Sequence, residues 1–129
     1  MAANDQIISG KKEMSILQIN FKLNVAPEEY RKICSSVAQP IADVPGLVWK
    51  VWMLSEQDGE AGGIYLFQDR QSLDAYLSGP IIRQIQSLPQ LREISAKRFE
   101  TIPELTAVTR GPIPALATTQ QATEEGGLI

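Results

Sequence analysis

Residues 46–69, GLVWKVWMLSEQDGEAGGIYLFQD, decide the fold of this chain. Residues 47–55 are rich in β-branched and aromatic side chains, which favour a strand. Residues 57–59, QDG, have the composition of a turn, and residues 64–68 resume the strand pattern. The stretch therefore predicts a β-hairpin with a loop of about four or five residues.

The hairpin contains two adjacent glycines, Gly62 and Gly63, in its second arm. Glycine weakens a strand, so we expect it to mark a bulge or a close approach of backbone or ligand. The register decides which side chains share a face, because a slip by one residue exchanges the two faces. We expect an even loop to place Trp49 on the side of Tyr65, and an odd loop to place Lys50 and Trp52 there.

The segments before the hairpin predict a strand followed by a helix. Residues 15–23 alternate strictly between apolar and polar side chains, which is the period of a strand. Pro27 suits the first position of a helix, and apolar residues then recur at helical spacing along residues 30–41. Pro40 is expected to bend or end this helix.

The segments after the hairpin predict a broken helix and a last strand. Asp69 can cap the next helix, because its carboxylate can accept a hydrogen bond from a free backbone N–H. The pair Gly79 and Pro80 divides the apolar helical pattern into two pieces. Residues 91–101 then alternate as a strand.

The order of elements is β-α-β-β-α-β, which predicts a ferredoxin-like α+β fold: an antiparallel four-stranded sheet with its helices on one face. We assign residues 15–101 to this domain, residues 1–14 to an N-terminal extension and residues 102–129 to a C-terminal tail. The hairpin is apolar on both faces, so the uncovered face of the sheet should pack on a second copy. We expect a homodimer, with the tail docked on the partner.

Composition excludes several classes of function. The chain has 129 residues and no histidine, which excludes Ser-His-Asp and Cys-His catalysis and imidazole metal ligands. One cysteine cannot build a thiolate metal site, so no metal is expected. The net charge of −3 and the scattered basic residues argue against nucleic acid. No apolar run is long enough to span a membrane, and we expect a cytoplasmic protein.

The residues WKVW (49–52) and EAGGIYLF (60–67) resemble the YdhR-like monooxygenases. These small dimeric α+β-barrel proteins are related to the antibiotic-biosynthesis monooxygenases, and the order of elements agrees over residues 15–101. The resemblance implies a dimeric barrel with a pocket between sheet and helices in each subunit. It also implies oxidation of an electron-rich aromatic substrate by dioxygen with neither metal nor flavin. Haem-degrading relatives use a histidine that this chain lacks.

Three residues are candidates for catalysis. Lys50 lies in an apolar strand, where desolvation would favour a neutral amine that acts as a base; if charged, it would hold a substrate anion. The alternative to a catalytic role is that Lys50 extends its amine to the surface or forms an ion pair with Glu60 or Glu100. Asn20 and Tyr65 could stabilise an oxyanion, although Asn20 could equally face solvent or the dimer partner, and Tyr65 could bond across a buried seam.

Four further residues are candidates for substrate binding: Gln18, Trp49, Trp52 and Phe67. The two tryptophans lie three residues apart on a strand and so face opposite sides. Either could stack on a planar substrate, but packing in the core or the dimer is the simpler interpretation. Cys34, on the apolar face of the first helix, is expected to be an inert buried thiol.

The sequence therefore favours a cofactor-independent monooxygenase that acts on a small aromatic or polyketide-like substrate. The alternative is a dimeric barrel that binds a small molecule without turning it over. A polar group placed at the reactive atom of the ligand would distinguish the enzyme from the binding protein. RNA binding, known for other ferredoxin-like sheets, is disfavoured because the strand at residues 61–68, AGGIYLFQ, has no basic residues.

Overall fold

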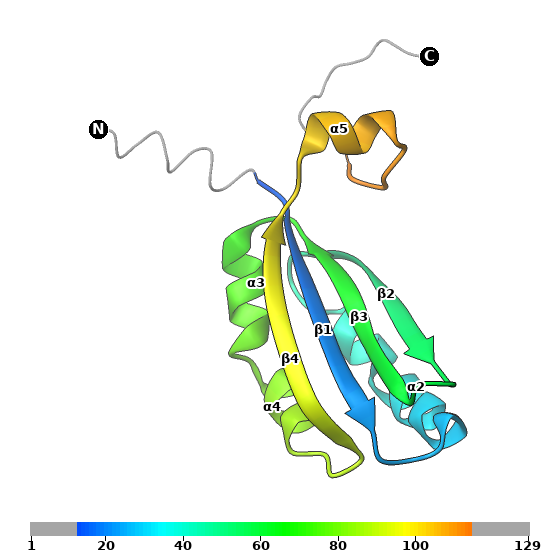
Figure 1. Cartoon of the computed structure of the whole chain (residues 1–129). Coiled ribbons are helices and arrows are strands. Elements are labelled where there is room, and N and C mark those ends of the chain that lie inside the picture. Colours follow the sequence, from blue (N-terminus) through cyan, green and yellow to red (C-terminus); the bar gives the residue numbers. More distant parts are fainter. Residues whose placement is uncertain (1–12, 115–129) are drawn as a thin grey trace.

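The computed structural model describes residues 13–114 (Figure 1). Its elements follow the predicted order, with one additional helix at the end. They are β1 (Ser15–Leu23), α2 (Pro27–Ala42), β2 (Leu47–Ser55), β3 (Glu60–Phe67), α3 (Arg70–Leu77), α4 (Pro80–Gln86), β4 (Leu91–Glu100) and α5 (Pro103–Val108). Residues 1–12 and 115–129, and with them most of the predicted extension and half of the predicted tail, lie outside the described residues.

The four strands form one antiparallel sheet in the order β2-β3-β1-β4. Figure 1 shows α2, α3 and α4 together behind this sheet, while its other face is open. The ferredoxin-like α+β fold is thereby confirmed. Within residues 13–114, none of the helices combines the length and the apolar character that crossing a bilayer requires.

The hairpin register corrects the parity expected from the sequence. Ser55 pairs directly with Glu60, so the loop is even, yet Lys50 pairs with Tyr65. The expectation that an even loop brings Trp49 to the side of Tyr65 was wrong. Directly paired residues share a face, and five residues before Ser55 and five residues after Glu60 the strands pair Lys50 with Tyr65. Trp49, next to Lys50 in the same register, therefore points to the open face, and a bulge follows between Leu47 and Trp49.

The core lies between the sheet and its helices. Alternate residues of β1 point into it, so that Leu17 and Ile19 are almost fully buried while Gln18 between them is not. Tyr65 and Phe67 stack at a centroid distance of 6.1 Å. The buried core comprises Leu17, Ile19, Phe21, Tyr30, Ile41, Ala61, Tyr65, Phe67, Leu73, Tyr76, Ile82 and Leu91.

Local signals in the sequence explain where the helices begin and end. Asp69 accepts a hydrogen bond of 2.8 Å from the backbone N–H of Ser72, which confirms the predicted cap of α3. Pro27 occupies the start of α2 as predicted. This helix ends at Ala42, within the turn that contains Pro40. It thus carries Tyr30 and Ile41, both buried, on the face that meets the sheet.

The predicted C-terminal tail contains a helix, α5, that its composition did not indicate. The following segment packs on its own chain, because the indole N–H of Trp49 donates a hydrogen bond of 2.8 Å to the carbonyl of Pro112. At the other end, Met14 is buried, so the packed region begins within the predicted extension. Docking of the tail on a partner stays a prediction.

The two glycines of β3 lead to a first prediction. A Cβ at Gly62 would lie 2.0 Å from the carbonyl oxygen of Ile19 in the backbone of β1, which cannot move without breaking the sheet. We expect Gly62→Ala to lower the free energy of unfolding by about 2–4 kcal/mol. Chemical denaturation measures it.

The matched control is Gly59→Asn in the hairpin loop. Gly59 has φ of 65° and nothing within 4 Å of an added Cβ, and asparagine tolerates this conformation. Its effect should stay below about 1 kcal/mol. Equal effects of both substitutions would contradict the close approach of the strands as the reason for Gly62.

Candidate active site between the sheet and the helices

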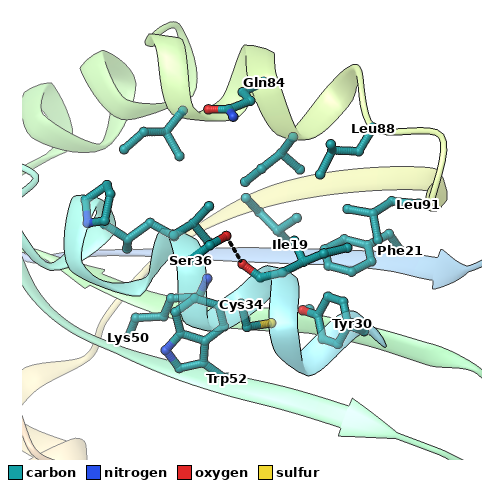
Figure 2. A pocket seen from close by; sticks show the side chains of 18 of the residues that line it. Ile19, Phe21, Tyr30, Cys34, Ser36, Lys50, Trp52, Gln84, Leu88 and Leu91 are labelled. Atoms are coloured by element: carbon teal, nitrogen blue, oxygen red, sulfur yellow. Dashed lines mark hydrogen bonds between the residues drawn. The ribbon is translucent and has the colours of Figure 1, made fainter. Parts of the chain in front are cut away.

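A cavity of about 510 Å³ lies between the sheet and helices α2 and α4. Its wall is mainly aliphatic and aromatic, as in most small-molecule sites. Figure 2 shows Lys50 and Trp52 on one side of this cavity and Gln84, from α4, on the other. Polar groups on the lining come from Tyr30, Cys34, Ser36, Lys50, Tyr65 and Gln84.

Lys50 lies against aromatic rings and not against an acidic partner. Its Nζ is 3.4 Å from the centroid of the Trp52 ring and 4.6 Å from that of Tyr65. Both distances allow a cation–π interaction. Nζ makes no hydrogen bond or ion pair with any residue in the described range. The expected alternative, a pair with Glu60, is not formed, since Glu60 pairs with Lys22 at 3.6 Å.

The neighbouring glycine makes room for this lysine. A Cβ at Gly63 would lie 2.6 Å from Cε of Lys50 and 3.5 Å from its Nζ. The expectation of a close approach at the glycine pair is confirmed for both residues: at Gly62 by backbone, at Gly63 by the side chain of Lys50. The pair therefore shapes the floor of the cavity.

Burial lowers the pKa of Lys50 to about 8, and the neighbouring Cys34 opposes this effect only in part. Water solvates an ammonium better than the cavity does, so the neutral amine gains in relative stability. At pH 7 roughly one molecule in ten then carries the neutral amine. Lys50 can therefore accept a proton near neutral pH, and it can also stabilise an anion once it is charged.

Two phenols line the cavity in different ways. Tyr65 accepts a hydrogen bond of 3.1 Å from the hydroxyl of Tyr76, so it turns its ring toward Lys50 and its hydroxyl toward α3. Tyr30 lies beside Cys34 on the cavity wall. Burial raises the pKa of both Tyr30 and Tyr65 far above the ordinary value. Both phenols thus remain neutral, and Tyr30 can donate a hydrogen bond to a ligand.

The structure brings three of the predicted site residues together: Lys50, Tyr65 and Trp52 all line the cavity. Gln18 and Asn20 lie on the open face of the sheet, where the amide of Gln18 donates to Asn20 at 2.9 Å. The sheet separates them from Lys50.

Trp49 and Phe67, predicted for substrate binding, also lie outside this cavity. Trp49 alternates with Lys50 along β2 and so lies on the open face. Phe67 is on the helix side but completely buried in the core, where it stacks on Tyr65.

No pattern in the sequence marked Tyr30, Ser36 or Gln84 as a cavity residue. Tyr30 was already on the predicted apolar face of α2, which signalled an interior position but not contact with a cavity. Gln84 lies among apolar residues of α4 and carried no signal. Within residues 13–114, no three His, Cys, Asp or Glu side chains are arranged to hold a metal ion.

The chain around this cavity matches a known protein family. Residues 16–112 match the model of the family described as "Putative mono-oxygenase ydhR". The chain belongs to this family. The match confirms the resemblance noted in the sequence and extends past residue 101 into the segment that bonds Trp49. No curated protein matches the chain.

Several solved structures have the same fold as this chain. SnoaB, a cofactor-independent oxygenase from Streptomyces nogalater, is 18% identical with a TM-score of 0.59, covering 70% of this chain and 94% of that one. A putative antibiotic biosynthesis monooxygenase from Caulobacter crescentus is 12% identical with a TM-score of 0.60, over 76% and 98% of the two chains. At such identities the likeness shows the shared α+β fold.

The environment of Lys50 leads to a second prediction. Its pKa is lower in the folded than in the unfolded chain, so its charged form destabilises the fold; this penalty is complete below pH 8 and vanishes as the pH rises toward 10.5. Lys50→Met should raise Tm by about 3–6 °C at pH 7, and the gain should shrink above pH 8. Thermal denaturation across this pH range measures both.

The control is Lys22→Met, because Lys22 lies on the surface and pairs with Glu60. It should give no such gain. A lower Tm for Lys50→Met at pH 7 would show that contact with the Trp52 ring outweighs the penalty for burying the charge.

Proposed function

We propose that this member of the ydhR family is a cofactor-independent monooxygenase that oxidises a small aromatic or polyketide-like substrate in the cavity. One observation carries the proposal: the amine of Lys50 lies in an apolar cavity with no acidic partner in the described range, and its pKa is about 8. Groups with such shifted pKa values, placed in a pocket, are typical of acid–base catalysis.

The first step is a proton transfer. Neutral Lys50 accepts a proton from an activated C–H or O–H of the substrate, such as the methylene group of an anthrone. The resulting ammonium then stabilises the substrate anion, and the apolar lining strengthens this attraction. The neutral hydroxyl of Tyr30 and the amide of Gln84 can donate hydrogen bonds to the substrate oxygens.

The second step uses dioxygen as the oxidant. The substrate anion transfers electrons to dioxygen and forms a carbon–oxygen bond, which gives a hydroperoxide after protonation by Lys50. Loss of water from the hydroperoxide converts the original methylene into a carbonyl. One oxygen atom stays in the product and the other leaves as water. The substrate supplies all four electrons, so the step needs no other reductant.

The alternative is a protein that binds such a molecule without oxidising it. The largely aliphatic and aromatic wall of the cavity favours this reading. Lys50 favours the enzyme, because an amine without an acidic partner adds nothing to the binding of a purely apolar ligand and lowers its affinity by its own solvation.

A third prediction tests the enzyme. Dithranol, a dihydroxyanthrone, should support oxygen uptake measured with an oxygen electrode. The rate should rise about tenfold per pH unit below pH 8 and level off above it, because only the neutral amine is a base. Lys50→Met should reduce kcat/KM at least a hundredfold, corrected for autoxidation. Lys50→Arg should be equally inactive, because arginine keeps the charge but cannot accept the proton.

Tight binding of dithranol without oxygen uptake above the rate of autoxidation at any pH would contradict the proposed oxygenase activity. Unaltered uptake by the Lys50→Met variant would instead leave the enzyme standing but remove Lys50 from it.

We also propose that the protein is a cytoplasmic homodimer in which two open sheet faces pack together. Val51 and Phe99 lie on this face with exposed fractions of 52% and 47%, which is unusual for large apolar side chains in a strand. On α5, Leu105 and Val108 are also exposed, so the C-terminal segment can extend the contact onto the partner. The single cysteine accords with a reducing compartment.

A fourth prediction concerns this face. Val51→Lys places a charge in the proposed contact and should convert the dimer into monomers in sedimentation-velocity experiments. Lys32→Glu, a charge reversal at an exposed residue of α2 on the helix side of the sheet, is the control and should retain the dimer. A wild-type monomer at micromolar concentration would refute the assembly.

A further inference from the structure

A second cavity of about 480 Å³ lies beside the first, between the end of α2, helix α3 and the start of α4. Two side chains, Pro40 from α2 and Ile81 from α4, line both cavities. They therefore form the partition between the two spaces. Behind them the hydroxyl pair continues the partition, since Tyr76 lines the second cavity and donates its hydrogen bond to Tyr65, which lines the first.

The partition is thin and local. Ile81 is the second residue of α4, a seven-residue helix that begins at Pro80. Pro40 lies in the last turn of α2. In front of the hydroxyl pair, the partition consists of Ile81 and Pro40 at two helix ends, where a change of the Ile81 rotamer would open a passage between the cavities.

The two cavities differ in polar character. The second is lined by the carboxylate of Asp43, the hydroxyl of Ser72 and the amide of Gln71, while its lining includes no basic side chain. Asp43 accepts one hydrogen bond of 3.0 Å, from the amide of Gln39. Its acceptors thus suit a ligand group that donates hydrogen bonds or carries a positive charge.

We infer that the two cavities form one elongated site. An aromatic ring system occupies the first cavity, and an amino- or hydroxyl-bearing substituent passes Ile81 to reach Asp43 in the second. The inference deepens the proposed function and rests on it, because it defines the substrate class as a two-part molecule: a planar apolar portion and a polar, donor-bearing arm. Ile81 and Asp43 are then the residues that determine specificity.

The location of the second cavity supports this assignment. Its lining residues come from the helices and the loops beside them, so it lies on the helix side of the sheet. Packing of the opposite, open face against a second copy would leave it accessible. The polar arm would therefore lie close to solvent while the aromatic portion is enclosed.

Two probes with the same ring system test the elongated site by calorimetry. Propranolol is a naphthyl ether with a hydroxyl- and amine-bearing arm, and 1-naphthol lacks that arm. We expect the wild-type protein to bind propranolol at least threefold more tightly. Asp43→Asn should weaken propranolol three- to tenfold, and Ile81→Trp, which fills the passage, more than tenfold. Asp43→Asn should not change the affinity for 1-naphthol by more than about twofold, and Ile81→Trp, which also lines the first cavity, should weaken 1-naphthol less than propranolol.

The control is Glu28→Gln, which removes a charge at the other end of α2 and should leave both affinities unchanged. A wild-type protein without preference for propranolol, or variants that alter both probes equally, would overturn the elongated site. Asp43→Asn preserves the shape of the side chain, so its propranolol affinity tests the elongated site even if the Ile81→Trp variant does not fold. Because binding is measured without turnover, these outcomes are independent of the oxygen-uptake experiment that decides the oxygenase.

Discussion

The register of the β2–β3 hairpin is the constraint on which the site depends. Direct pairing of Ser55 with Glu60 brings Lys50 opposite Tyr65 and Trp52 opposite Gly63 on the face covered by the helices. A slip by one residue would move the amine of Lys50 out of the cavity and onto the open face. Gly62 and Gly63 make this register possible, because larger residues would collide with β1 or with Lys50 itself.

A charged amine in an apolar cavity costs stability, and the local structure offsets this cost only in part. The faces of Trp52 and Tyr65 lie close enough to attract the charge, yet the pKa of Lys50 still falls to about 8. A methionine would fill the same space without this penalty. Departures of this kind from good packing are expected where a residue serves chemistry, because a functional group must keep a reactive, imperfectly satisfied state.

The sequence predicted the fold well because its signals are local. Alternation in residues 15–23 and the carboxylate of Asp69 act within a few residues of the elements they define. The expected parity of the hairpin was wrong, because an even loop places Lys50, and not Trp49, opposite Tyr65. The bulge before Trp49, the helix α5 and the position of Gln84 on the cavity also escaped prediction, since each depends on how distant segments pack together.

The alternation of β2 resolves the main ambiguity of the hairpin, that an apolar two-faced strand suits a pocket and a dimer equally well. Lys50 and Val51 are neighbours in the chain, but one lines the cavity and the other lies exposed on the open face. The two roles therefore belong to different side chains of one strand. They remain coupled through its backbone, because a partner packed on Val51 would restrict the motion of the strand that positions Lys50. Assembly through this face would therefore stiffen the floor of the cavity, and a monomeric variant should bind its ligand more weakly although every cavity residue is intact.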